Sequence, residues 1–85
     1  MKQFTIDCAA ITNPRQLHKA LAEALDFPQW YGNNLDALHD CLTALTEETS
    51  LTLLRFGTLG SFSAGFRRVL QNSEEENPLL HIFFK

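Results

Sequence analysis

The order in which the hydrophobic spacing changes along the chain is the strongest constraint on the fold. Segments with the two-residue or continuous apolar spacing of strands alternate with segments that have the three- and four-residue spacing of helices. The predicted order is strand, helix, helix, strand, helix, strand, at residues 2–7, 14–26, 34–46, 50–56, 62–76 and 79–84. Since helices separate consecutive strands, the strands should run parallel, in an α/β fold whose helices pack on the sheet.

The length of the chain limits it to one hydrophobic core. With 85 residues it is long enough for one small domain and too short for two, so we expect a single domain over residues 1–85. No apolar run resembles a signal peptide or a membrane span. Two cysteines, Cys8 and Cys41, are too few for the several disulfide bonds that stabilise a small secreted domain. We therefore expect a cytoplasmic protein with reduced thiols, monomeric when free, with no membrane partner.

Local signals predict details of the turns, the helix ends and the last strand. Asn33 or Asn34 is the expected cap of the second helix, and Ser61 that of the third. Gly32 is expected in a tight turn or at positive φ just before the second helix. The final segment, residues 79–84, is almost continuously apolar. Such a run is typical of a strand covered on both faces.

The charge is distributed unevenly along the chain. Seven basic and ten acidic residues give a formal net charge of −3, which argues against nucleic acid as a partner. Residues 20–54 contain six acids and no Lys or Arg, so this segment carries −6 and the rest of the chain +3. An acidic block of this kind indicates a cationic partner.

The second predicted helix has an acidic face. At about 100° per residue, Asp36, Asp40 and Glu47 fall on one side. The opposite side is the predicted buried stripe of Leu35, Leu38, Leu42 and Leu45. Asp36 and Asp40 repel each other at i and i+4, and no cation nearby in sequence offsets that cost of a few tenths of a kcal/mol. The only Trp and Tyr, Trp30 and Tyr31, lie in the preceding loop, and both residue types are enriched at interfaces.

Other interpretations of these residues remain open. The acids are also compatible with an ordinary solvated helix face, and the two aromatics with a cap on the core. Catalysis is disfavoured because a carboxylate pair needs a pocket, and this face is convex. A metal held by Asp36, His39 and Asp40 has a poor angular spread, and no nucleophile or phosphate-loop motif is present. We therefore expect no catalytic residue, no metal and no cofactor.

Residues 27–43 resemble the signature of the barstar family, intracellular inhibitors of the ribonuclease barnase. The motif Tyr-Gly-x-Asn-Leu-Asp-Ala-Leu-x-Asp-Cys-Leu-Thr matches residues 31–43 without a gap. The resemblance implies a barstar-like three-stranded parallel sheet with three or four helices packed on it. It also implies a stoichiometric inhibitor, not an enzyme, that blocks a small basic ribonuclease of the extracellular type or a related toxin. The alternative is an interaction or immunity module on the same fold that binds a basic protein or toxin that is not a ribonuclease.

The resemblance also implies which residues contact the partner. Asp40 would take the place of a phosphate and accept hydrogen bonds from Arg and His side chains, with Asp36 as a second contact. Trp30 stands where the family has a tyrosine that stacks on the active-site histidine of the enzyme. The other implied contacts are Tyr31, Asn34, Leu35, His39, Thr43 and Glu75.

The chain departs from the family pattern within this surface. His39 replaces a tryptophan, which removes an aromatic ring and adds a titratable group. Leu45 replaces a larger aromatic residue. Glu75 is aligned with a family glutamate through the preceding Val-Leu-Gln, but it is flanked by Glu74 and Glu76, so the contact could be any of the three.

Overall fold

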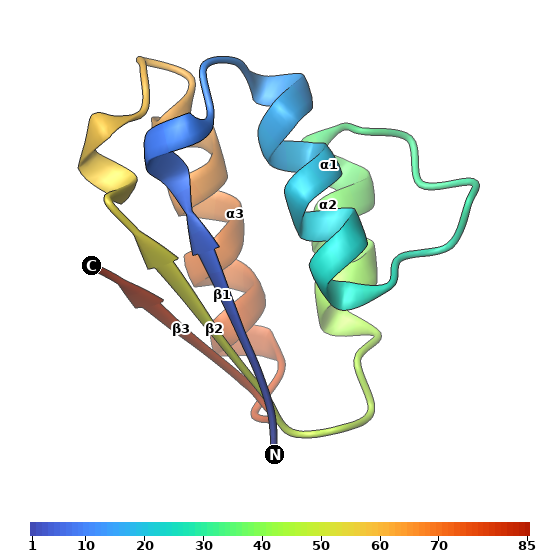
Figure 1. Cartoon of the computed structure of the whole chain (residues 1–85). Helices are drawn as coiled ribbons and strands as arrows, with labels where there is room; N and C mark the ends of the chain where they lie inside the picture. Colours follow the sequence, from blue (N-terminus) through green and yellow to red (C-terminus); the bar gives the residue numbers. More distant parts are fainter.

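The computed structural model describes all 85 residues and contains one three-stranded parallel sheet (Figure 1). The strands are β1 (Lys2–Asp7), β2 (Thr49–Leu54) and β3 (Leu80–Phe84), and they lie side by side in that order. Both neighbouring pairs are parallel. The helices α1 (Pro14–Leu25) and α2 (Leu35–Thr43) connect β1 to β2, and α3 (Ser63–Glu76) connects β2 to β3. The predicted α/β class and β-α-α-β-α-β order are confirmed.

Two of the three helices begin at an asparagine cap. The side chain of Asn13 accepts a hydrogen bond from a first-turn amide of α1, and Asn34 caps α2 in the same way. The predicted cap at Ser61 is wrong, because α3 begins at Ser63 and has no side-chain cap. The second helix is also shorter than predicted, because it ends at Thr43 and not near residue 46.

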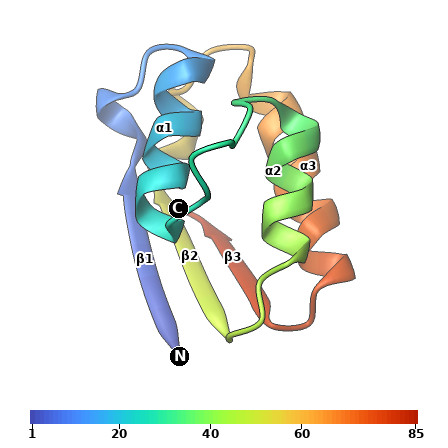
Figure 2. The same cartoon turned by 90° about the vertical axis from the view of Figure 1, so that its right-hand side faces the viewer.

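All three helices pack on one face of the sheet (Figures 1 and 2). Alternate side chains of β3 show the consequence, since Leu80 and Ile82 are buried while Phe83 is 47% exposed. The prediction that the last strand is covered on both faces is therefore wrong. With the strand order β1-β2-β3 and right-handed crossovers, each connection places its helices on the same face and leaves the other face open.

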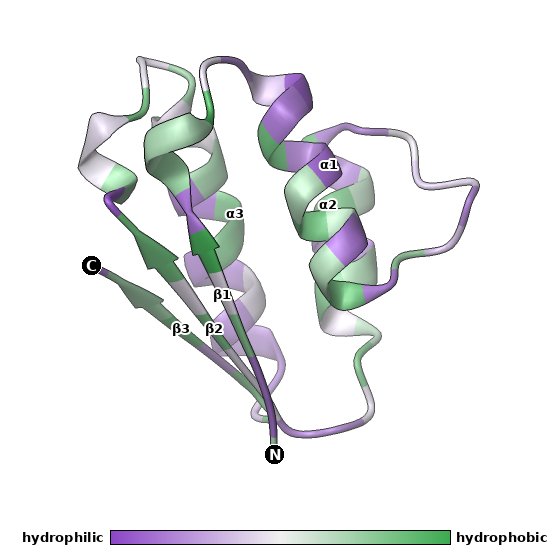
Figure 3. Cartoon of the chain, in the orientation of Figure 1, coloured by the Kyte–Doolittle hydropathy of each residue, from purple (hydrophilic) through white to green (hydrophobic).

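A single cluster of 16 buried apolar residues fills the space between sheet and helices. The hydrophobic colour follows much of β2 and β3, whereas the loop between α1 and α2 is largely hydrophilic or neutral (Figure 3). Phe56 belongs to a short 3-10 turn (Phe56–Thr58) and not to β2 as predicted, but it is still buried. Cys8 and Cys41 are both free thiols. No helix has the length and apolar character needed to cross a membrane.

Candidate functional site

The candidate surface consists of the outer side of α2, the loop before it and the end of α3. The loop from Asp26 to Asn34 returns along the helices, so α2 runs in the same direction as α1 (Figure 2). Of the two alternatives predicted for Gly32, positive φ is not found, and Asn33 takes that conformation instead, with φ 54°. A residue larger than Gly32 would displace a neighbouring side chain. A Cβ there would lie 2.9 Å from Nδ2 of Asn34, the cap of α2.

Tyr31 anchors this loop to the core. Its side chain is only 8% exposed, and its hydroxyl lies 2.6 Å from Nδ1 of the buried His18. The Tyr31 ring packs on Phe27, and the His18 ring packs on Phe66. Burial lowers the pKa of His18 and raises that of Tyr31. The imidazole is therefore neutral, and its Nδ1 can accept a hydrogen bond from the Tyr31 hydroxyl. Tyr31 was predicted as a partner contact, but here it positions the loop that carries its neighbour.

That neighbour, Trp30, is 77% exposed. An indole this accessible on a small domain is available to a partner, since large aromatic side chains are mostly buried. Trp30 also borders a cavity of about 220 Å³ between the loop and the end of α2, with Asp40 and Leu45 among its lining residues. The exposed side chains of Trp30 and Asp40 therefore both border the same apolar cavity.

Asp36 and Asp40 are displayed without a Lys or Arg partner. Asp36 lies in the first turn of α2, where the helix dipole favours it, and it takes part in no ion pair within the protein. The side chain of Asp40 is 82% exposed, and the only basic group within 4.0 Å of it is Nδ1 of His39, at 3.9 Å. Glu47 was predicted on the same face, but it lies beyond the end of α2 and pairs with Lys2 at 3.3 Å.

The other predicted contacts on α2 occupy mixed environments. Asn34 is exposed, and its Oδ1 accepts the amide hydrogen of Ala37 at 2.7 Å, which commits the side chain to the cap. Leu35 is half-buried against α3, where a Cβ added to Gly65 would lie 3.0 Å from its Cδ1. The hydroxyl of Thr43 donates to the carbonyl oxygen of His39 at 2.8 Å, which leaves its lone pairs free to accept.

The three consecutive glutamates at the end of α3, residues 74–76, have different neighbours. Glu74 accepts the backbone amide hydrogen of Ile82 on β3 at 2.6 Å. Glu76 accepts a hydrogen bond from Nε2 of His39 on α2. Glu75 is exposed and pairs with no cation in the protein. Glu76 is thus the member of the run that adjoins the acidic face of α2 through a direct contact, and Glu75 remains free for an external one.

The comparisons with known proteins agree with this arrangement. The profile of the family described as "Barstar (barnase inhibitor)" matches residues 1–83. The chain belongs to the barstar family. A similar protein from Bacillus subtilis (strain 168), named "Putative ribonuclease inhibitor YrdF", is 40% identical over 81 residues, which cover 89% of each chain. The resemblance predicted from residues 27–43 therefore extends over almost the whole length.

One residue that supports the surface of this barstar-family chain was missed by sequence reasoning. Asn77 is 5% exposed, and its Nδ2 donates to the carbonyl oxygens of Leu42 at 3.0 Å and Leu45 at 3.2 Å. Its Oδ1 accepts the amide hydrogen of Leu79. Asn77 therefore joins the end of α2 to the end of α3. The sequence predicts only that the third helix ends at residue 76, because the carbonyl oxygens that Asn77 binds belong to residues more than 30 positions away.

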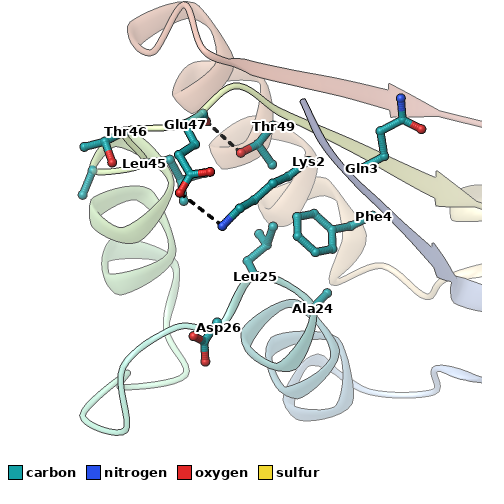
Figure 4. Close-up of a pocket in the computed structure, with 11 residues that line it drawn as sticks. Lys2, Gln3, Phe4, Ala24, Leu25, Asp26, Leu45, Thr46, Glu47 and Thr49 are labelled. Atoms are coloured by element: carbon teal, nitrogen blue, oxygen red, sulfur yellow. Dashed lines mark hydrogen bonds and ion pairs between the residues drawn. The ribbon is translucent and has the colours of Figure 1, made fainter.

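The barstar-family chain has a larger cavity of about 560 Å³ at the start of β1 (Figure 4). Phe4 and Leu25 form part of its apolar wall, and Lys2 reaches across toward Glu47 (Figure 4). This ion pair occupies the one lysine that lines the cavity. No three His, Cys, Asp or Glu side chains anywhere in the chain are grouped so that they could hold a metal ion.

Proposed function

We propose that this barstar-family protein is a stoichiometric inhibitor of a small basic ribonuclease and blocks its active site with the acidic face of α2. The observation that carries the proposal is Asp40, a carboxylate 82% exposed with no Lys or Arg partner. A ribonuclease must bind phosphate, so its active site presents cations. A carboxylate at the position of a phosphate accepts charge-assisted hydrogen bonds from the same side chains.

The surrounding structure favours tight binding through Asp40. The helix that carries it is held by Leu38 and Leu42, both fully buried, so little backbone freedom is lost on binding. Asp40 is hydrated in the free protein, and its desolvation is offset only if the partner supplies cations in good geometry. This requirement favours a cationic cleft over an arbitrary basic surface.

The remaining proposed contacts surround this carboxylate. Trp30 would stack on a planar side chain of the partner, and Asp36 would meet a second cation. Asn34, Leu35, Thr43 and Glu75 complete the surface. Tyr31 acts indirectly by holding the loop on which Trp30 lies. The cytoplasmic location and the monomeric state stay predictions.

The direct test is inhibition of barnase by the purified protein and two variants. Asp40→Ala should weaken binding by about 2–5 kcal/mol, roughly 30- to 4,000-fold, because it leaves partner cations buried and unpaired. The matched control is Glu23→Ala, which removes an exposed acid on α1 that pairs only with Lys19. It should leave inhibition almost unchanged. Both variants should unfold at nearly the wild-type temperature, because both side chains are exposed.

Two results would contradict the proposal. Equal inhibition by the Asp40 and Glu23 variants would show that α2 is not the contact surface. A folded wild-type protein that inhibits no basic ribonuclease would favour the module that binds another basic protein. The association rate gives a second measurement, since it should fall as salt is raised if the acidic segment steers the encounter.

A further inference from the structure

His39 connects the two helices that carry the acidic surface. On one side Nε2 donates to the carboxylate of Glu76 on α3. On the other side Nδ1 lies 3.9 Å from the carboxylate of Asp40 on its own helix. The imidazole is 35% exposed. Neither Asp40 nor Glu76 pairs with a Lys or Arg of the protein, so these two acids are the charged groups that face His39.

We propose that His39 makes binding of the cationic partner depend on pH, with affinity increasing as the pH rises. This inference rests on the proposed function. In the free protein a protonated His39 partly neutralises Asp40 and Glu76. Partner cations that bind the same carboxylates compete with that proton, because a protonated imidazole between them would repel the incoming charge.

The direction of the effect follows from the two protonation states. The hydrogen bond with Glu76, and then the nearby negative charges, raise the pKa of His39 above its ordinary value in the free protein. Cations placed beside Asp40 and Glu76 in the complex would lower that pKa again. The complex then binds fewer protons than the separate proteins, so affinity rises between the two pKa values, by at most about tenfold per pH unit.

The proposal also assigns Glu76 a role that differs from that of Glu75. Glu76 holds the imidazole over the acidic surface and is the principal cause of its raised pKa. His39 is therefore a positioning and specificity residue that acts through Asp40 and Glu76. A partner whose cations reach both acids would show the full pH dependence, whereas one that reaches neither would show none.

The first experiment measures the dissociation constant with barnase from roughly pH 5 to 8, the range in which histidines titrate. Wild type is compared with His39→Gln, and the ratio of their affinities cancels the titration of the enzyme itself. We expect the affinity of wild type relative to that of His39→Gln to increase as the pH rises. The matched control is His81→Gln, because His81 also pairs with one glutamate, Glu48, but lies on β3. Its profile should follow that of wild type. A wild-type slope retained in His39→Gln overturns the proposal.

The second experiment examines the free protein by NMR and does not depend on a ribonuclease. The pKa of His39 should fall in Glu76→Gln and stay unchanged in Glu75→Gln. Equal pKa values in wild type and Glu76→Gln overturn the pairing on which the inference rests. Absence of barnase binding at every pH, with the NMR result as expected, contradicts the proposed function and the role of His39 in binding, but not the pair itself.

Discussion

The hydrogen bond between Tyr31 and His18 permits a quantitative test of how the loop before α2 is held in place. Tyr31→Phe removes only the hydroxyl, so the ring keeps its packing on Phe27. What is lost is a buried hydrogen bond of 2.6 Å. The imidazole nitrogen is left without a partner at a site where the side chain is 4% exposed. We expect Tyr31→Phe to lower the free energy of unfolding by about 1–3 kcal/mol.

This loss should be visible by thermal and urea denaturation. For a domain of this size about 1 kcal/mol shifts the melting temperature by roughly 4–8 °C. His18→Phe should also be destabilising, because it leaves the buried tyrosine hydroxyl unpaired. The double variant should cost less than the sum of the two, since two apolar rings leave no unsatisfied group. Additivity of the single variants within about 0.5 kcal/mol would refute this account.

The same pair predicts how stability changes with pH. Burial lowers the pKa of His18 in the folded protein, so below about pH 6.5 the unfolded chain binds more protons than the folded one. Stability from this site is complete above that pH and decreases as the pH falls below it. His39 acts in the opposite sense, because its raised pKa contributes stability at low pH that is lost as the pH rises. Comparison of wild type with His18→Phe isolates the first effect, and an identical pH dependence in the two would contradict it.

Two further variants test the ends of α3. Asn77→Ala should lower the free energy of unfolding by about 2–3 kcal/mol, from the loss of three buried or partly buried hydrogen bonds. Asn77→Asp should be worse at neutral pH, because its carboxylate faces two carbonyls at a helix C-terminus, and it should partly recover as acid protonates it. Urea titrations at several pH values would detect this, and parallel pH profiles would contradict it. Glu74→Ala frees the amide of Ile82 on an edge strand, so we expect more aggregation by light scattering than for Glu75→Ala. Equal aggregation would contradict the protective role of Glu74.

Much of the fold was predictable because its determinants are local. The change from strand to helix spacing predicted the six elements and their parallel arrangement, since helical crossovers between strands leave few other topologies. Of the two expected caps of the second helix, Asn34 is the one the structure uses, and it was predictable because a cap depends on residues within one turn. The motif at residues 31–43 indicated the barstar family, and its exposed acids indicated a cationic partner.

Several parts that were predicted wrongly or left open depend on contacts that are distant in sequence. The early end of α2 is stabilised by Asn77, whose side-chain amide donates hydrogen bonds to the carbonyl oxygens of Leu42 and Leu45. The open face of the sheet follows from the handedness of both crossovers together and not from the composition of β3. The different neighbours of the three consecutive glutamates, among which the sequence left the contact open, depend on which elements adjoin α3, because a helix turns each side chain by about 100° relative to the one before.

The sequence by itself therefore determined the class of fold, the family and the acidic character of the surface, because these follow from local spacing and from charge. Only the tertiary structure decided which side chains reach that surface. It buried Tyr31 against His18 and removed Glu47 from the acidic face. It also joined His39 to Glu76. Each outcome depends on packing between elements far apart in the chain, where burial and geometry override the local pattern.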